Sequence, residues 1–182
     1  IDSLPLHSIH RPTLRKRIIA VPQDPVFLPG SPTLLSNLDP DSLTSKSECL
    51  DVLRAINLES LADTDVEELS AGQKQLLSLG RAILRRRMRK EGGVLLLDEV
   101  GSSVDGETDR MMGEIIRREF EGYTVVMIAH RLGMVREFFD RVVVLDQGRV
   151  VEEGEPGVLV GVEGSRFREL WVSGKYEDVE AA

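Results

Sequence analysis

The sequence has few aromatic residues, a single cysteine and no long apolar run. Aromatic residues make up 4% of the 182 residues, which argues against the stacking platforms that bind single-stranded nucleic acid. Cys49 cannot form a disulfide within the chain, which fits a reducing, cytosolic setting. No apolar stretch approaches the roughly 20 residues that span a bilayer, and the N-terminus lacks a signal-peptide layout. We expect any membrane-spanning part to lie elsewhere.

Positive charge is also scarce. The 23 lysines and arginines stand against 31 aspartates and glutamates, a net charge of −8 at pH 7, which argues against a protein that binds a phosphate backbone. The basic run at 85–90 is the local exception. We interpret it as a solvated helix end whose cations complement the helix dipole, with an RNA or lipid contact as the minor alternative.

What is present indicates a soluble α/β protein. Hydrophobic residues form 41% and charged residues 30% of the chain, whose length suits one domain or a large part of one. Residues 18–21 form a short β-type run, and the unbroken apolar run 94–97 predicts a strand covered on both faces. A helix from about 107 to 119 and a second buried strand at 123–129 complete a βαβ unit, which implies a parallel sheet with a right-handed crossover.

Helical spacing and turn residues predict the remaining elements. Apolar positions at helical spacing run through 46–62. Ser70 is a suitable N-cap for the next helix, and the segment ends at Gly92-Gly93. Two short β-type runs flank the turn at 146–148 and read as a hairpin. A last helix includes Phe167, and the polar tail from Gly174 is expected to fray.

Two polar groups follow these elements in positions suited to nucleotide chemistry. The segment 69–75 opens a helix, whose N-terminal N–H groups and dipole favour phosphate. About 25 residues further on, Asp98 and Glu99 close the apolar run. Asp98 would hold Mg²⁺ through water, and Glu99 would orient and deprotonate an attacking water. Together they predict a nucleotide-hydrolysing site, although an Asp-Glu pair can also simply cap a strand in solvent.

The helix-opening segment resembles the signature motif of the ATP-binding cassette (ABC) family, Leu-Ser-Gly-Gly-Gln. Here it reads Leu69-Ser70-Ala71-Gly72-Gln73, so Ala71 replaces the first glycine. Other motifs match the family in the same order, namely Gln23 in a Pro-Gln-Asp-Pro turn, Asp98-Glu99, Asp105 in Ser102-Ser103-Val104-Asp105, and His130. One such motif is a weak signal, but the ordered set is specific. The resemblance covers the chain from Ile1 to about Gly174.

The resemblance implies a role for each of these residues. Gln23 would reach Mg²⁺ and the attacking water. His130 would contact the γ-phosphate and sense its loss, although a lone histidine at a strand end is more often a structural hydrogen-bonder. Asp105 would lie in the loop that crosses the dimer interface, a role compatible with capping the next helix. The signature residues would contact ATP held by the opposite cassette; they are Ser70, Ala71, Gly72 and Gln73.

The implied fold is a partial cassette. It has a P-loop NTPase-like core with a parallel sheet, a small helical signature subdomain at about 41–90 and a C-terminal hairpin, with the N-terminal strands missing. The partial nucleotide-binding domain would span 1–174, and 175–182 would be a polar tail. Asn37-Leu38-Asp39-Pro40 and Gln73-Lys74-Gln75-Leu76 resemble the second cassette of subfamily C, the multidrug-resistance-associated exporters. Gly92-Gly93 and Pro29-Gly30-Ser31 resemble its fungal members.

The sequence departs from the family in lacking the phosphate loop, Gly-x-x-x-x-Gly-Lys-Ser/Thr. That loop wraps the β- and γ-phosphates with backbone N–H groups and a lysine, so we expect that this chain cannot hold ATP in its own composite site. The missing stretch includes a core strand, so we also expect exposed apolar faces and marginal stability or aggregation. The loop at 30–37 is longer and the stretch 41–69 shorter than the subfamily pattern. In the family this subdomain docks on the transmembrane part, so these differences bear on the coupling of ATP hydrolysis to transport.

Three functional readings follow. The first is the C-terminal part of a cassette that hydrolyses ATP with Mg²⁺ to drive solute export. Its partners would be a second nucleotide-binding domain in a head-to-tail dimer and transmembrane domains, at the cytoplasmic face of a membrane and without nucleic acid. The second is a non-catalytic truncated cassette or interaction module that completes a partner in trans. The third, a DNA-repair type of cassette, is disfavoured by the acidic charge, by Gln73 and by the segment 129–132.

Overall fold

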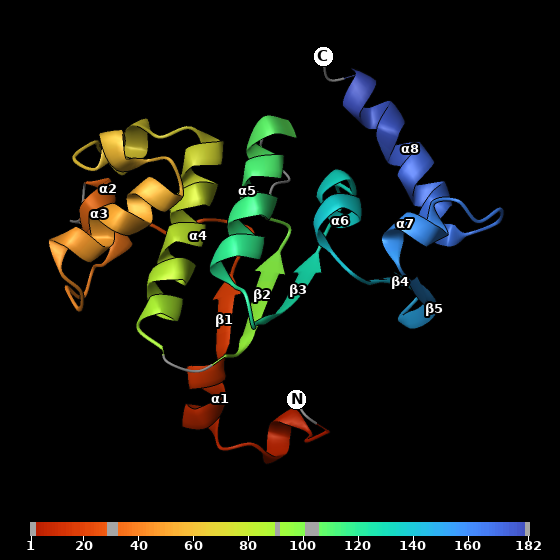
Figure 1. Ribbon diagram of the computed structural model, residues 1–182, viewed down its shortest axis with the longest axis horizontal. Coiled ribbons are helices and arrows are strands. Elements are labelled where there is room, and N and C mark those ends of the chain that lie inside the picture. The colour runs from red at the N-terminus through yellow and green to blue at the C-terminus, as the bar shows by residue number, and fades with distance from the viewer. Residues whose placement is uncertain (1–2, 29–32, 90–91, 101–105, 181–182) are drawn as a thin grey trace. The chain divides into compact units, whose positions relative to one another are not determined.

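The computed structural model describes residues 3–28, 33–89, 92–100 and 106–180. The chain divides into two compact units, Ile1–Ile128 and Ala129–Ala182. The first unit contains a three-stranded sheet with helices packed on one of its faces, and the second contains a two-stranded sheet with three helices in its described residues (Figure 1).

The sheet of the first unit is parallel throughout. Its strands are β1 (Ile18–Val21), β2 (Val94–Asp98) and β3 (Thr124–Ile128), in the order β1-β2-β3. Ile18 pairs with Val94, which pairs in turn with Thr124. Helix α5 (Gly106–Glu119) connects β2 to β3. The predicted α/β fold with a parallel βαβ unit is therefore confirmed.

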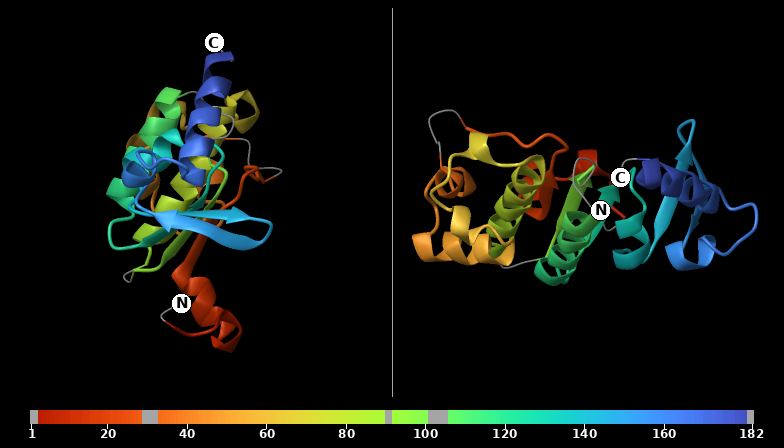
Figure 2. Two further views of the ribbon diagram at one scale, coloured as in Figure 1. Left: turned by 90° about the vertical axis from the view of Figure 1, so that its right-hand side faces the viewer. Right: turned by 90° about the horizontal axis from the view of Figure 1, so that it is seen from above.

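Within the described residues of the first unit, helices cover one face of this sheet. Helices α4 (Ala71–Arg87) and α5 lie side by side on it (Figures 1 and 2). The residues that point toward them are buried: Ile19, Val21, Leu95 and Leu97. On the opposite face Leu96, Val126 and Ile128 are 37%, 50% and 58% exposed. The prediction of strands buried on both faces was wrong, because an apolar run does not reveal how many layers pack on a strand.

Short helices pack against α4. They are α2 (Leu34–Leu38) and α3 (Lys46–Ala55), followed by the 3₁₀ turns η2 (Glu59–Leu61) and η3 (Val66–Glu68). Gly80 of α4 lets them approach closely, since a Cβ atom there would lie 2.8 Å from Ile56 Cδ1. Helix α3 is shorter than the predicted 46–62, because Asn57 adopts a left-handed backbone (φ 59°) that stops the helix.

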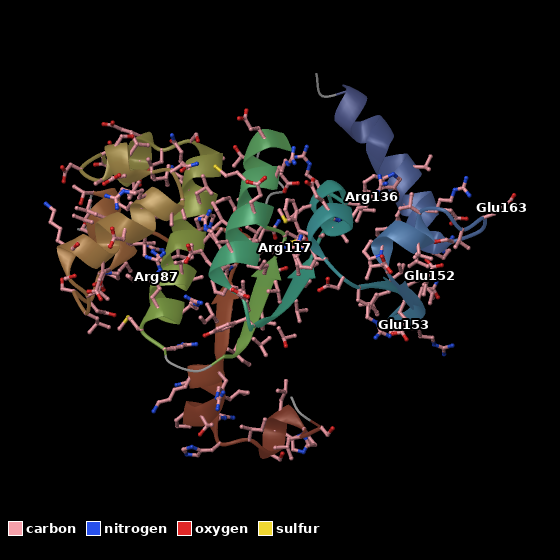
Figure 3. All side chains as sticks on the ribbon, viewed as in Figure 1. Arg87, Arg117, Arg136, Glu152, Glu153 and Glu163 are labelled. Carbon is pink, nitrogen blue, oxygen red and sulfur yellow. The ribbon has the colours of Figure 1, made fainter. Side chains whose placement is uncertain are left out.

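The basic run ends α4 but is not merely solvated. The helix stops at Arg87, well before Gly92. Arg87, labelled in Figure 3, donates to Glu119 at 3.0 Å. Arg89 donates to the main-chain oxygens of Ile18 and Arg15, each at 3.2 Å, which connects this end of α4 to β1 and to helix α1 (Arg11–Arg17). A further 3₁₀ turn, η1 (Leu6–Ser8), precedes α1.

The second unit contains the predicted hairpin. Strands β4 (Val142–Asp146) and β5 (Arg149–Gly154) pair antiparallel. Gln147 and Gly148 both have positive φ, 49° and 76°, as a type I′ turn requires. Its helices are α6 (Gly133–Phe138), α7 (Pro156–Leu159) and α8 (Arg166–Glu180). Helix α8 thus continues beyond Gly174, where the sequence predicts fraying.

Contacts within the second unit attach α8 to the hairpin and to α6. The carboxylate of Glu152 accepts from the Phe167 N–H at 2.8 Å and from Ser165 Oγ at 3.0 Å. Arg136 lies 5.3 Å from the centre of the Trp171 ring; Figure 3 labels both Arg136 and Glu152.

None of the helices in the described part of the chain has both the length and the apolar composition to cross a lipid bilayer.

Candidate functional site

Two of the predicted site residues meet at the carboxyl-terminal edge of the parallel sheet. Gln23 follows β1 by two residues, and Glu99 directly follows β2. The Gln23 side-chain amide donates from Nε2 to Glu99 Oε2 at 2.8 Å. Parallel strands end at the same edge of a sheet, where ligands bind in α/β folds. The structure thus joins residues that are 76 positions apart in sequence.

The backbone at Glu99 is in a rare conformation. Its φ of 49° lies in the left-handed region, which a non-glycine residue adopts at a cost of about 1–3 kcal/mol. Its N–H donates to the Ile128 carbonyl at 3.0 Å, so the turn is fixed to the end of β3. Asp98, the last residue of β2, is exposed. The chain therefore turns between the two carboxylates, as a shared site requires.

Helix α4 holds the segment that follows Gln23. Gln75 donates from Nε2 to the Gln23 main-chain oxygen at 2.8 Å. Arg81 donates to the Val26 main-chain oxygen, and buried Asn37 accepts the Leu28 N–H at its Oδ1 at 3.0 Å. The segment that carries Gln23 is therefore attached to α4 at both ends.

The ring of Phe27 lies close to two cations of α4. Lys74 Nζ is 5.8 Å and Arg81 Cζ 5.6 Å from the ring centre, within the range of cation–π attraction. Burial, together with the charge of Arg85, lowers the pKa of the Arg81 guanidinium. These contacts place the apolar ring of the segment against the positively charged side of the helix.

The signature residues form the N-terminal cap of α4. The Ser70 N–H donates to Gln73 Oε1 at 2.8 Å, and the Gln73 N–H donates to Ser70 Oγ at 3.2 Å. This reciprocal capping box confirms Ser70 as the N-cap. Ala71 and Gly72 are the first helical residues, where N–H groups have no partner inside the helix. Gln73 thus has a structural role that the sequence analysis did not assign.

Two predicted residues do not belong to the described part of the first unit. Asp105 lies outside the described residues. His130 belongs to the second unit, where it is exposed and follows β3 by two residues.

Sequence reasoning missed Gln75, Arg81 and Asn37. The available signal was a set of polar residues within the apolar face of a helix, since Gln75 is buried beside Leu76 and Leu79. A buried polar side chain needs a hydrogen-bonding partner. The sequence alone does not reveal that this partner is the Gln23 segment.

The polar groups at the sheet edge suit a hard cation. Among the described residues, no group of three or more histidine, cysteine and carboxylate side chains could hold a metal. A nucleotide-bound Mg²⁺ instead needs one or two protein oxygens, because phosphates and water supply the other ligands. Asp98 and Gln23 offer such oxygens, so the residues fit the ion without forming a complete cage.

Comparisons with known proteins agree with these features. The family model described as ABC transporter matches residues 1–102. The chain is 53% identical over 189 residues to the ABC transporter FGM5 of Gibberella zeae and 50% identical over 192 residues to the ABC-type transporter braE of Annulohypoxylon truncatum. Each alignment covers 96% of this chain but 13% of the relative, so the chain spans about an eighth of their length.

A solved structure matches the whole chain. A bacterial Atm1-family ABC exporter with ATP bound superposes with a TM-score of 0.80 at 26% identity, covering 100% of this chain and 32% of the exporter chain. The α/β fold with its three-stranded parallel sheet is thus that of an ABC exporter cassette. The chain belongs to the ABC transporter family and is part of an ATP-binding cassette.

Proposed function

We propose that the chain is the C-terminal part of a cassette that binds and hydrolyses ATP to drive solute export. We further propose that it comes from the second cassette of a multidrug-resistance-associated, subfamily C exporter, at the cytoplasmic face of a membrane. The observation that carries the proposal is the hydrogen bond between Gln23 and Glu99 at the sheet edge. It places a candidate base beside an amide that can orient water.

The proposed chemistry is shared by residues of this edge and by two others, His130 and Asp105. Glu99 takes the proton of the attacking water, and Gln23 orients Glu99. Asp98 and Gln23 would hold Mg²⁺, which when bound neutralises charge on the phosphates. His130 contacts the γ-phosphate. Asp105 crosses to the partner cassette.

The signature turn acts on a second nucleotide-binding domain in a head-to-tail dimer. The Ser70 hydroxyl accepts the Gln73 N–H and keeps its own proton to donate. With the N–H groups of Ala71 and Gly72, it forms a donor set at the positive end of a 17-residue helix. Such a set fits the γ-phosphate of ATP held by the opposite cassette.

A chimera tests the catalytic assignment. This chain would replace its matching segment in the relative FGM5, and ATP hydrolysis would be measured with the purified transporter. We expect Glu99→Gln to lower turnover by at least about 100-fold while ATP binding remains. Glu114→Gln, which changes an exposed carboxylate of α5, is the matched control. Unchanged hydrolysis in Glu99→Gln would contradict the assignment.

The alternative is a non-catalytic module that completes a partner's site in trans. It is favoured by the intact signature cap, which in a head-to-tail dimer would serve the opposite cassette. The isolated chain, added to a purified cassette that carries its own phosphate loop, would then raise that cassette's turnover. Hydrolysis seen only in the chimera favours the first function.

A further inference from the structure

Gln75 is a buried polar residue to which neither the sequence motifs nor the family match assigns a function. Its side chain is 4% exposed, and Nε2 donates to the Gln23 main-chain oxygen at 2.8 Å. Its Oε1 is buried and has no hydrogen-bonding partner in the described part of the chain. The reverse orientation of the amide would bring two oxygens together, so Gln75 acts toward Gln23 as a donor.

Gln23 is therefore held at two points. Its main chain is attached to α4 through Gln75, and its side chain reaches Glu99 at 2.8 Å. Strand β1 ends at Val21, so no ladder hydrogen bond fixes Gln23 itself. The bond from Gln75 therefore helps to set the position of the Gln23 amide, and with it the orientation of the Glu99 carboxylate.

We propose that Gln75 is a positioning residue for ATP hydrolysis, which links the signature turn of a cassette to the candidate base of the same cassette. Gln75 follows Gln73 by less than one helical turn, so a displacement of the first turn of α4 moves Gln75 and Gln23 together. The link rests on the proposed function of Glu99. It makes the orientation of that base sensitive to what the signature turn binds.

The first test separates turnover from binding. In the chimera, Gln75→Met keeps the length of the side chain but removes the donor. We expect kcat to fall about 10- to 100-fold, because a misplaced catalytic group loses rate steeply with distance, while KM for ATP stays within about twofold. Ser78→Ala, a change at another buried polar residue of α4, is expected to leave both unchanged. A Gln75→Met chimera with wild-type kcat would overturn the proposal.

A spectroscopic readout does not depend on activity. In the isolated chain, the side-chain amide resonances of Gln23 are expected to shift in Gln75→Met toward their position in Glu99→Ala, and to stay in place in Ser78→Ala. If the Gln23 side-chain amide resonances did not shift in Gln75→Met, the proposed link would be overturned. A wild-type chimera without ATP hydrolysis would instead count against the proposed function, while the resonance shift would still test the link.

Discussion

Arg81 donates two hydrogen bonds to Asn37: Nε donates to the Asn37 main-chain oxygen at 2.7 Å, and Nη2 donates to its Oδ1 at 3.0 Å. The same Oδ1 accepts the Leu28 N–H. One fully buried amide oxygen thus serves donors from α4 and from the segment after Gln23. Helix α2, helix α4 and this segment depend on one another through that atom.

We expect Arg81→Lys to destabilise the chain by about 1–2 kcal/mol, because a lysine cannot reproduce the fork of hydrogen bonds to Asn37 and Val26. Urea unfolding followed by circular dichroism measures the loss. Arg85→Lys, an exposed change one turn further along α4, is the control and is expected to stay within about 0.5 kcal/mol of wild type. Equal stability of the two variants would show that the hydrogen bonds from Arg81 to Asn37 contribute nothing to the free energy of unfolding.

The cap of α4 and its proposed phosphate contact can be separated at Ser70. Ser70→Asp keeps a good N-cap, so stability is expected to change by less than about 0.5 kcal/mol. Its carboxylate would nevertheless repel a phosphate, so ATP turnover in the chimera is expected to fall. The control is Ser45→Ala, which removes the equivalent capping box of α3 and is expected to lower stability by about 1 kcal/mol without affecting turnover. If Ser70→Asp left ATP turnover unchanged, Ser70 would have a capping role alone.

Acid is expected to weaken the region around the N-terminus of α3. The pKa of Glu48 is lowered from its ordinary 4.5, first by the hydrogen bond from the Ser45 side chain. Burial raises the pKa of Asp39, but hydrogen bonds from Thr44 and Leu43 outweigh it, so the pKa lies below 3.8. Since both pKa values are lower in the folded state, their stabilisation is complete above the unfolded values and is lost as the pH falls through the folded ones.

A variant isolates the contribution of Glu48. Glu48→Gln can still complete the capping box but does not titrate, so its stability is expected to fall less between pH 5 and 3 than that of wild type. Glu121→Gln, at an exposed glutamate outside the capping boxes, is the control. Melting temperatures across this range measure the difference, and parallel curves for the two variants would refute the contribution of Glu48.

The uncovered sheet face is expected to drive self-association. Val126 and Ile128 are at least half exposed, and an apolar surface of this kind marks an interaction site or an aggregation hazard. The double change Val126→Thr, Ile128→Thr keeps β-branched side chains. It is expected to reduce the binding of a dye that is sensitive to exposed apolar surface, and to shift the sedimentation profile toward that of a monomer. Leu43→Ser, at an exposed leucine in the loop before α3, is the control. If the double variant self-associated as strongly as wild type, the surface responsible for self-association would lie elsewhere.

The sequence predicted best what local chemistry determines. Strand propensity predicted β1 at Ile18–Val21, and capping preference predicted Ser70 as the N-cap of α4. Turn residues predicted the hairpin turn at Gln147-Gly148. The family resemblance implied that Gln23 and Glu99 both act on the attacking water, but the hydrogen bond between them was not predicted. The contacts of Gln75 and Arg81 with the Gln23 segment could not be predicted, because long-range hydrogen bonds leave no periodic signal.

Burial was the other limit. Leu96 and Val126 are apolar residues of strands. The sequence analysis expected exposed apolar faces, but it did not identify these residues as part of one, and the arrangement of the helices does. The end of α3 before Asn57 was missed for a related reason. The apolar spacing continues through the left-handed residue, and a period cannot reveal a single reversed φ.

The left-handed backbone at Glu99 also has an evolutionary consequence. Glycine and asparagine adopt a φ of 49° more easily than glutamate does. With Glu99 in its proposed role as the base, stability and chemistry therefore favour different residues at this position. A gene copy released from selection for hydrolysis is expected to drift toward glycine or asparagine here, since that drift relieves strain. Among paralogues, the residue at this position would then separate cassettes that still hydrolyse ATP from those that have stopped.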